Sequence, residues 1–343
     1  MSNAVQAALA RLLRRENLSQ AESAALMRAL ADESLPPALA GAVLAALRSK
    51  GETAEELRGF ASAMRDLAFR VELPGDLPAA DVVGTGGDSS GSFNISTGSA
   101  LLAAACGVPV VKHGNRSVSS RSGSADVLEA LGVPLARDAS HAIECLRECG
   151  FTFLFAPTFH PAMKAIAPVR RALGARTVFN VLGPLTNPAA PPFSCIGAFD
   201  LPTARLMAEA LSGLPIVRAF VVHGEPGWDE ATPVGPFTVF DVRPGTVRRA
   251  RRNPLHYGLS ACSPAALAGG DVATNARALE MVLTGADRGA HRDALLLGAG
   301  LVLDLTGRTR GLRRGIEAAA RVIDSGAAGT FLARLRAFAR GRP

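Results

Sequence analysis

The chain has 343 residues, of which 48% are hydrophobic and 20% are charged. This composition is typical of a globular protein and excludes a fibrous or disordered chain, and the length suits one large domain or two smaller ones. The sequence has no apolar run as long as a membrane helix and no hydrophobic signal-peptide core at its N-terminus. We therefore expect a cytoplasmic protein with no membrane partner.

The formal net charge is +7, which makes nucleic acid a partner to consider. However, nearly all the cations are arginines, and the arginine clusters at 248–252 and 308–314 contain no aromatic residues for bases to stack on. We interpret these clusters as solvated basic surface and do not expect nucleic acid as a partner. The five cysteines are scattered along the chain, which indicates reduced thiols rather than a disulfide framework.

Residues 1–70 have the apolar periodicity of helices and no strand signal. Ser19 with Glu22, and Thr53 with Glu56, have the spacing of capping boxes, so a helix is expected to begin after each of these hydroxyl residues. Two prolines separate a third helix from the one before it. The pattern therefore predicts four short helices.

From residue 80 onward, strands and helices alternate, which is typical of a largely parallel sheet with helical crossovers. The expected strands are 80–83, 108–112, 152–155, 195–199 and 218–222, the expected helices are 97–106, 123–131, 139–149, 203–212 and 275–284, and a hairpin is expected at 237–250. The predicted fold class is α/β, with a small N-terminal helical domain (1–72) and a larger α/β domain (73–343) built on a central, mostly parallel sheet. The helical stretch at 160–188 is expected to join the first domain in space.

Two polar loops interrupt the α/β pattern, each just after a short β-branched run. The first is GTGGD at 84–88, closed by NIST at 94–97, and the second is KHGNRSVSS at 112–120. Backbone N–H groups, hydroxyls and a cation in so few residues suit a ligand with several anionic oxygens. Neither loop is a P-loop, and Ser89 occupies the last glycine position of a dinucleotide fingerprint. Ordinary polar turns are the alternative, but two turns seldom share this chemistry by chance.

Taken together, these motifs resemble the anthranilate phosphoribosyltransferase family, nearly end to end and in the right order. The matching blocks are LRSKGET (47–53), the two loops, GSADVLEALG (123–132), HPAMKAIAPVRRALGARTVFNVLGPLTNP (160–188), VHG (222–224), DE (229–230), GGD (269–271) and IDSG (323–326). The resemblance implies transfer of the phosphoribosyl group of phosphoribosyl pyrophosphate to the amine of anthranilate, with release of pyrophosphate, in tryptophan biosynthesis. It also implies that 73–343 is the phosphoribosyl-pyrophosphate-binding domain and that the helical domain forms a homodimer.

The resemblance also implies residue roles. The residues expected to bind phosphoribosyl pyrophosphate are Gly84, Thr85, Gly86, Gly87, Asp88, Asn94, Ser96, Thr97, Lys112, Ser119 and Ser120. Those expected to bind anthranilate are Gly84, His113, Asn115, Arg170 and Gly183, because a guanidinium can bind a carboxylate through two hydrogen bonds. Ser96, Asp229 and Glu230 are expected to hold Mg²⁺, as two ions bound with the substrate. No residue is assigned as a general base, and Lys112 with Mg²⁺ is expected to stabilise the transition state.

Two positions depart from the family pattern. Trp228 stands where the family usually has a smaller aliphatic residue, and Gly298 where it commonly has asparagine. Three other functions stay open from the sequence: a paralogue that binds nucleic acid without turnover, a pyrimidine nucleoside phosphorylase, and a transferase for a substituted aminobenzoate. Salt-dependent binding without turnover would indicate the first, and phosphorolysis of thymidine the second.

Overall fold

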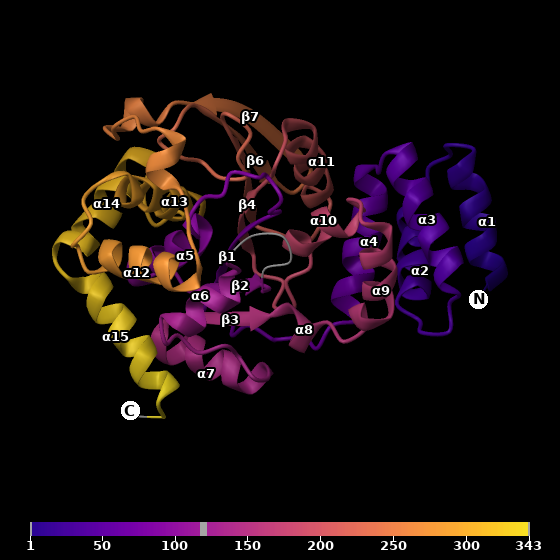
Figure 1. The fold of residues 1–343 in the computed structure, drawn as a ribbon, viewed down its shortest axis with the longest axis horizontal. Coiled ribbons are helices and arrows are strands. Elements are labelled where there is room, and N and C mark those ends of the chain that lie inside the picture. The colour runs from indigo at the N-terminus through magenta and orange to yellow at the C-terminus, as the bar shows by residue number, and fades with distance from the viewer. Residues whose placement is uncertain (1, 117–121, 342–343) are drawn as a thin grey trace.

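A helical part and an α/β part lie next to each other along the long axis of the molecule (Figure 1). The computed structural model describes residues 2–116 and 122–341. The predicted fold class is confirmed, since four N-terminal helices precede a central seven-stranded sheet covered by helices. No helix in the described ranges is both long and apolar enough to cross a bilayer.

The helical part begins as the capping signals predict. Its helices are α1 (Ser2–Leu13), α2 (Gln20–Leu30), α3 (Pro37–Lys50) and α4 (Ala54–Asp66). Both predicted capping boxes are present, with the Ser19 hydroxyl accepting from the Glu22 N–H and the Thr53 hydroxyl from the Glu56 N–H. The local sequence therefore sets where α2 and α4 begin.

A buried ion pair fastens these helices together. The Glu56 side chain is 0% exposed and the Lys50 side chain 3%, and their charged atoms lie 2.9 Å apart. The Glu56 carboxylate also accepts from the N–H of Leu18, at 2.9 Å, and from the N–H of Thr53, at 2.8 Å. One carboxylate thus joins the end of α3, the start of α4 and the segment before α2.

Later segments pack against these helices. α9 (Met163–Leu173) and α10 (Phe179–Leu182) contribute buried side chains to the same apolar cluster as α1–α4. The cluster continues without interruption onto α11 (Leu201–Leu211) and one face of the sheet. The two parts of the molecule therefore share a hydrophobic interface.

The sheet has the strand order β3-β2-β1-β4-β5-β6-β7. The strands are β1 (Ala80–Gly84), β2 (Val110–Gly114), β3 (Phe151–Phe155), β4 (Phe193–Gly197), β5 (Arg218–Gly224), β6 (Phe237–Arg243) and β7 (Thr246–Arg252). The first five strands in this order are parallel, and β6 and β7 form the predicted hairpin. β2 ends two residues later and β4 two residues earlier than predicted, because β2 pairs with β3 through Gly114 and β4 stops where the segment around residue 229 packs onto it.

The remaining helices cover the sheet and its edges (Figure 1). They are α5 (Ile95–Ala105), α6 (Ser124–Ala130), α7 (Ala139–Cys149), α8 (Ala156–Phe159), α12 (Val272–Leu283), α13 (Ala290–Leu305), α14 (Leu312–Asp324) and α15 (Ala327–Ala339). The predicted elements end at residue 284, and three further helices form at 290–339. α13 is apolar on nearly all sides because it packs between α5 and α14, so it lacks the one-sided periodicity that marks a surface helix.

We expect Glu56→Gln to lower the free energy of unfolding by about 3 kcal/mol, because the change leaves the Lys50 charge buried without its partner. Urea denaturation followed by circular dichroism measures the loss. Glu22→Gln is the matched control, since Glu22 occupies the same capping-box position but is half exposed and should cost about 1 kcal/mol or less. Equal losses in the two variants would contradict the importance of the buried pair.

Candidate active site

Three parallel strands end in glycine at the same edge of the sheet, and the segment that carries Asp229 and Glu230 packs onto these ends. A Cβ atom on Gly84, at the end of β1, would lie 2.5 Å from the Asp229 carboxylate. A Cβ atom on Gly197 of β4 would overlap the carbonyl oxygen of Asp229, and one on Gly224 of β5 would overlap that of Glu230. Only glycine at these strand ends lets the acidic segment approach so closely.

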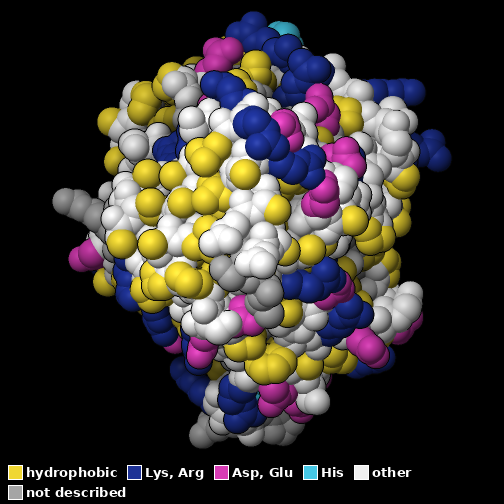
Figure 2. Space-filling model, turned by 90° about the vertical axis from the view of Figure 1, so that its right-hand side faces the viewer, with side chains coloured by type: hydrophobic (Ala, Val, Ile, Leu, Met, Phe, Trp, Pro, Cys, Tyr) yellow, Lys and Arg dark blue, Asp and Glu magenta, His cyan; other side chains and the backbone are white. Residues whose placement is uncertain are grey.

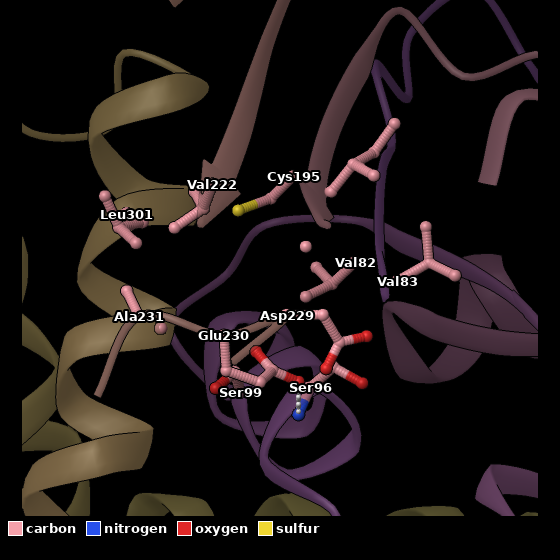
Figure 3. A pocket seen from close by; sticks show the side chains of 13 residues that line it. Val82, Val83, Ser96, Ser99, Cys195, Val222, Asp229, Glu230, Ala231 and Leu301 are labelled. Atoms are coloured by element: carbon pink, nitrogen blue, oxygen red, sulfur yellow. Dashed lines mark hydrogen bonds between the residues drawn. The ribbon is translucent and has the colours of Figure 1, made fainter. Parts of the chain in front are cut away.

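Of the two acidic residues, Asp229 is buried and Glu230 is partly buried. Asp229 is 8% exposed, accepts from the N–H of Gly86 at 2.6 Å, and donates its own N–H to the Asp88 carboxylate at 3.2 Å. Burial, together with the nearby Asp88 charge, raises the pKa of Asp229 to about 7. Glu230 accepts from the N–H of Ser96 at 3.1 Å, the contact drawn in Figure 3, and burial raises its pKa well above the ordinary value. The site thus holds negative charge in a poorly solvated place.

Lys112 lies beneath this site. It is 2% exposed, and its ammonium group donates to the carbonyl of Val82 and lies 3.4 Å from the Ser96 hydroxyl. Burial lowers the pKa of Lys112, while the charges of Asp81, Glu230 and Asp229 oppose that shift. Its ammonium group therefore lies close to the three carboxylates and to the first turn of α5.

The first predicted loop follows β1 directly. Gly86 and Gly87 adopt positive φ values of 66° and 72°, which favour glycine. Thr85 ties the loop to the end of β4, because its hydroxyl accepts from the N–H of Phe199 at 3.2 Å. Ser89 takes the left-handed conformation with φ 61°, where glycine would cost less.

Asn94, Ser96 and Thr97 lie at the N-terminus of α5, as predicted, although the helix begins two residues earlier than expected. The Asn94 side chain does not cap the helix; it accepts from Asn275 at 2.9 Å and from the Ser122 hydroxyl at 3.1 Å. The Thr97 hydroxyl is buried and has no hydrogen-bond partner among the described residues. The first turn of α5 therefore faces the acidic segment with Ser96 in direct contact.

The second predicted loop is described only in part. Asn115 is exposed, and its side-chain oxygen accepts from the N–H of Arg116 at 2.7 Å. Ser119 and Ser120 lie outside the described residues. His113 lies at the end of β2, buried, and its N–H donates to the Asp81 carboxylate at 3.2 Å.

A pair of neutral histidines joins the second loop to the region before α9. The rings of His113 and His160 are 5.1 Å apart, and the backbone of Gly183 lies near the His113 ring. Burial lowers the pKa of His113 to about 3 and that of His160 to about 4. Both Nε2 atoms are buried without a partner among the described residues. The structure thus brings together His113 and Gly183, as the site prediction requires.

Arg170 lies on α9, with its guanidinium 4.9 Å from the centre of the Phe179 ring. Burial lowers the pKa of this arginine. No carboxylate or carbonyl of a described residue accepts a hydrogen bond from it. A half-buried arginine without an anionic partner is suited to bind an anion from outside the chain.

Two small cavities flank these residues. One lies next to the acidic segment and is lined by Val82, Ser96, Ser99, Cys195, Asp229, Glu230, Gly298 and Leu301, among others (Figure 3). The other is mostly apolar and lies between α2, α4 and the start of α9, lined by Met27, Ala31, Met64, Leu67, His160, Ala162 and Met163. Both cavities are lined mainly by apolar side chains, and the first also includes the polar groups of Ser96, Ser99, Asp229 and Glu230.

The glycine at position 298, which lines the first cavity, has a steric explanation. A side chain at this position would collide with the Ser99 hydroxyl, which is buried and has no partner among the described residues. In this chain the serine and the glycine therefore fit as a pair.

The acidic segment has a donor set that suits Mg²⁺. Two adjacent carboxylates and a serine hydroxyl are hard oxygen ligands, which Mg²⁺ accepts together with water and substrate phosphates. Among the described residues, no group of three or more His, Cys, Asp or Glu side chains is placed to bind a metal without such help. The residues fit a metal that arrives with an anionic substrate.

Comparison with known proteins is in agreement with this geometry. Residues 6–68 match a glycosyl transferase family helical bundle domain, and residues 76–329 match the α/β domain of the same family. An anthranilate phosphoribosyltransferase of Desulforudis audaxviator is 48% identical over 334 residues, covering 97% of this chain and 96% of the relative. The chain belongs to the anthranilate phosphoribosyltransferase family.

Other family members agree. The Anaeromyxobacter dehalogenans enzyme is 49% identical over 324 residues, with 94% of this chain and 95% of the relative covered. The crystal structure of anthranilate phosphoribosyltransferase from Thermus thermophilus superposes with a TM-score of 0.91 at 43% identity, covering 97% of this chain and 99% of that one. The Saccharomyces cerevisiae enzyme in complex with PRPP (phosphoribosyl pyrophosphate) and Mg has a TM-score of 0.88 at 27% identity, covering 99% of each chain. Membership makes the protein a glycosyltransferase of the pentosyltransferase class.

The sequence analysis did not assign several residues that lie at the site. Asp81, whose pKa burial raises to about 6, is held by Asn187 at 2.8 Å beside the Lys112 charge. Gly197 and Gly224 make room for the acidic segment. The recurring signal was a β-branched or apolar strand that ends in glycine, at VVG, CIG and VVHG.

We expect Asp229→Asn to raise the melting temperature of the ligand-free protein by about 2 °C or more at pH 8. The reason is that a carboxyl whose pKa rises to about 7 on folding binds protons more tightly in the folded state, so its charge opposes folding increasingly as pH rises from about 4 to above 7.

Differential scanning fluorimetry of wild type and variant from pH 5 to pH 8 measures this difference, which should grow with pH. Asp76→Asn is the control, because Asp76 is an exposed aspartate and its loss should give no pH-dependent gap. A gap of the same size at every pH would contradict a raised pKa at Asp229.

Proposed function

We propose that the protein transfers the phosphoribosyl group of phosphoribosyl pyrophosphate to the amine of anthranilate in tryptophan biosynthesis. The observation that carries this proposal is a pair of adjacent carboxylates, one buried and one partly buried, that packs against a glycine loop and the N-terminus of α5. In this reaction the amine nitrogen forms a bond to C1 of the ribose, the bond from C1 to the pyrophosphate oxygen breaks, and the amine loses a proton. Phosphorolysis of a nucleoside would not require a paired-acid site for metal-bound pyrophosphate.

The phosphoribosyl pyrophosphate site is proposed to follow the sheet edge. Backbone N–H groups of Gly87 and Asp88 bind the diphosphate, while the N–H groups of Thr85 and Gly86 fix the loop by donating to the Gly197 carbonyl and the Asp229 carboxylate. Gly84 lets the ribose approach the strand end. Asn94, Ser96 and Thr97 lie at a helix N-terminus, where N–H groups and the helix dipole favour phosphate. Ser119 and Ser120 complete the proposed phosphate contacts. Lys112 acts from below, by offsetting the charge that substrate and carboxylates bring together.

Magnesium is proposed to bind at Asp229, Glu230 and Ser96, as two ions shared with the substrate. Bound there, it neutralises charge on the departing pyrophosphate. The protein side of this step is the two carboxylates, which the backbone of Gly86 and Ser96 holds in place through hydrogen bonds of 2.6 and 3.1 Å. Their raised pKa values mean that metal must displace protons to bind.

Anthranilate is proposed to bind between the helical part and the loop at 112–120. Arg170 binds its carboxylate, while His113, Asn115, Gly84 and Gly183 line the path of its ring. The histidines stay neutral at physiological pH, so they add no charge next to the ring. No general base is assigned, because the ortho carboxylate of anthranilate lies next to the amine and can accept its proton. Water exclusion follows if the helical domain, 1–72 with 160–188, closes onto domain 73–343.

We also propose a homodimer formed through the helical domain and a cytoplasmic location. Figure 2 shows hydrophobic side chains gathered on the face of the helical part, bordered by basic and acidic side chains. Leu13, at the end of α1, is 68% exposed. All five cysteines are free thiols, which is the state that a reducing compartment maintains.

Loss of anthranilate fluorescence tests the reaction directly. We expect the signal to decay only when protein, phosphoribosyl pyrophosphate and Mg²⁺ are all present. Arg170→Ala should raise the KM for anthranilate at least tenfold, because the carboxylate loses a charged hydrogen-bond partner. Glu230→Ala should lower kcat at least a hundredfold, because the diphosphate loses its metal.

Arg171→Ala is the matched control for charge, since Arg171 is an exposed arginine on the same helix and should keep wild-type kinetics. A folded wild-type protein that gives no decay would reject the proposed reaction. Other aryl amines, and then DNA, would be the next ligands to test.

The dimer is tested by size-exclusion chromatography with light scattering. We expect Leu13→Arg to shift the mass from two chains to one, because it places a charge in the proposed apolar interface. Leu255→Arg, on the α/β part, is the control, because Leu255 is also exposed and lies away from the helical face. A monomeric wild type would rule out the dimer.

A further inference from the structure

Arg176 joins the segment after α9 to the glycine loop. Its Nη2 atom donates a hydrogen bond to the carbonyl of Gly87. The same nitrogen would lie 3.4 Å from a Cβ atom at Gly87, so the guanidinium rests directly against the loop. None of the roles assigned above uses this arginine.

The Arg176 guanidinium also contacts an aromatic ring. The Arg176 guanidinium carbon lies 4.1 Å from the centre of the Phe199 ring, within cation–π range. The N–H of Phe199 in turn donates to the Thr85 hydroxyl at 3.2 Å. The Arg176 side chain therefore contacts Gly87 in the loop and Phe199, which is hydrogen-bonded to Thr85 of the same loop.

The charge of the loop makes this contact significant. Residues 84–92 contain a single charged side chain, the carboxylate of Asp88. Lys112 is buried beneath the loop and donates to Val82. Arg176 is exposed, and among the described residues its hydrogen bonding uses one N–H of the five that a guanidinium carries. Its remaining donors face solvent at the rim of a loop that would receive a diphosphate.

We propose that Arg176 binds the diphosphate end of phosphoribosyl pyrophosphate while it holds the glycine loop through Gly87. This inference rests on the proposed function. A planar guanidinium suits two neighbouring phosphate oxygens, and the Phe199 ring keeps the plane in one orientation. Because Arg176 follows Arg170 by six residues, the same short segment supplies a cation to each of the two substrates.

Inorganic pyrophosphate is the probe, since it lacks the ribose and tests the diphosphate contact alone. Its affinity, with Mg²⁺ present, is measured by calorimetry and by quenching of Trp228, the single tryptophan of the chain and the neighbour of Asp229. The KM for phosphoribosyl pyrophosphate and the KM for anthranilate are measured in parallel. The variants are Arg176→Ala, Arg176→Gln and Arg176→Lys, with Arg171→Ala as the matched exposed control.

We expect Arg176→Ala to weaken pyrophosphate binding and raise the KM for phosphoribosyl pyrophosphate about tenfold, with the KM for anthranilate changed less than twofold. Arg176→Lys should recover part of the loss, because it restores the charge. Arg176→Gln should be as weak as alanine, although glutamine keeps a donor for the Gly87 carbonyl. Arg171→Ala should bind as wild type does.

Two outcomes would overturn the proposal. If Arg176→Gln restores wild-type affinity, the residue only anchors the loop and does not bind the diphosphate. If all variants bind pyrophosphate within twofold of wild type, Arg176 has no role in this site. Wild-type protein that binds pyrophosphate but does not consume anthranilate would reject the proposed reaction alone, and the diphosphate contact would still be decided by the binding data.

Discussion

The active site depends on one steric constraint, the absence of side chains at the ends of three neighbouring strands. Gly84, Gly197 and Gly224 let the backbone of Asp229 and Glu230 lie against the sheet edge. A methyl group at any of them would overlap the acidic segment, so the carboxylates would move away from the glycine loop. Close backbone approach is what brings two acids, a helix N-terminus and the glycine loop to one place.

Bringing several carboxylates together in a poorly solvated place is electrostatically unfavourable. Asp81, Asp229 and Glu230 lie around one buried lysine, and burial raises the pKa of all three acids. Without a bound cation, the carboxyl groups of Asp229 and Glu230 either repel each other as anions or bind protons. In the proposed function, a divalent cation that arrives with the diphosphate would offset this negative charge.

The two parts of the molecule meet through a few specific contacts. The His113 and His160 rings join the end of β2 to the start of α9, and Arg176 joins the end of the same segment to the glycine loop. A shared apolar cluster, formed by α1–α4, α9, α10, α11 and one face of the sheet, also joins the two parts. Elsewhere the positive charge has a structural role: Arg218 is bound by Asp241 at 2.7 Å, and β7 ends the sheet with exposed arginines that discourage pairing with another strand.

The sequence by itself determined the starts of α2 and α4, the alternation of strands and helices as far as α12, the glycine loop and the family, because each follows from local spacing or from contiguous motifs. Ser19 and Thr53 cap their helices as their neighbours predict. The tertiary structure alone decided that Lys112 and Asp229 are buried, and that Arg176 reaches Gly87 across 89 residues. Burial and long-range contact depend on what packs from elsewhere in the chain. The same holds for α13, which lacks a one-sided pattern because it is enclosed on nearly every side.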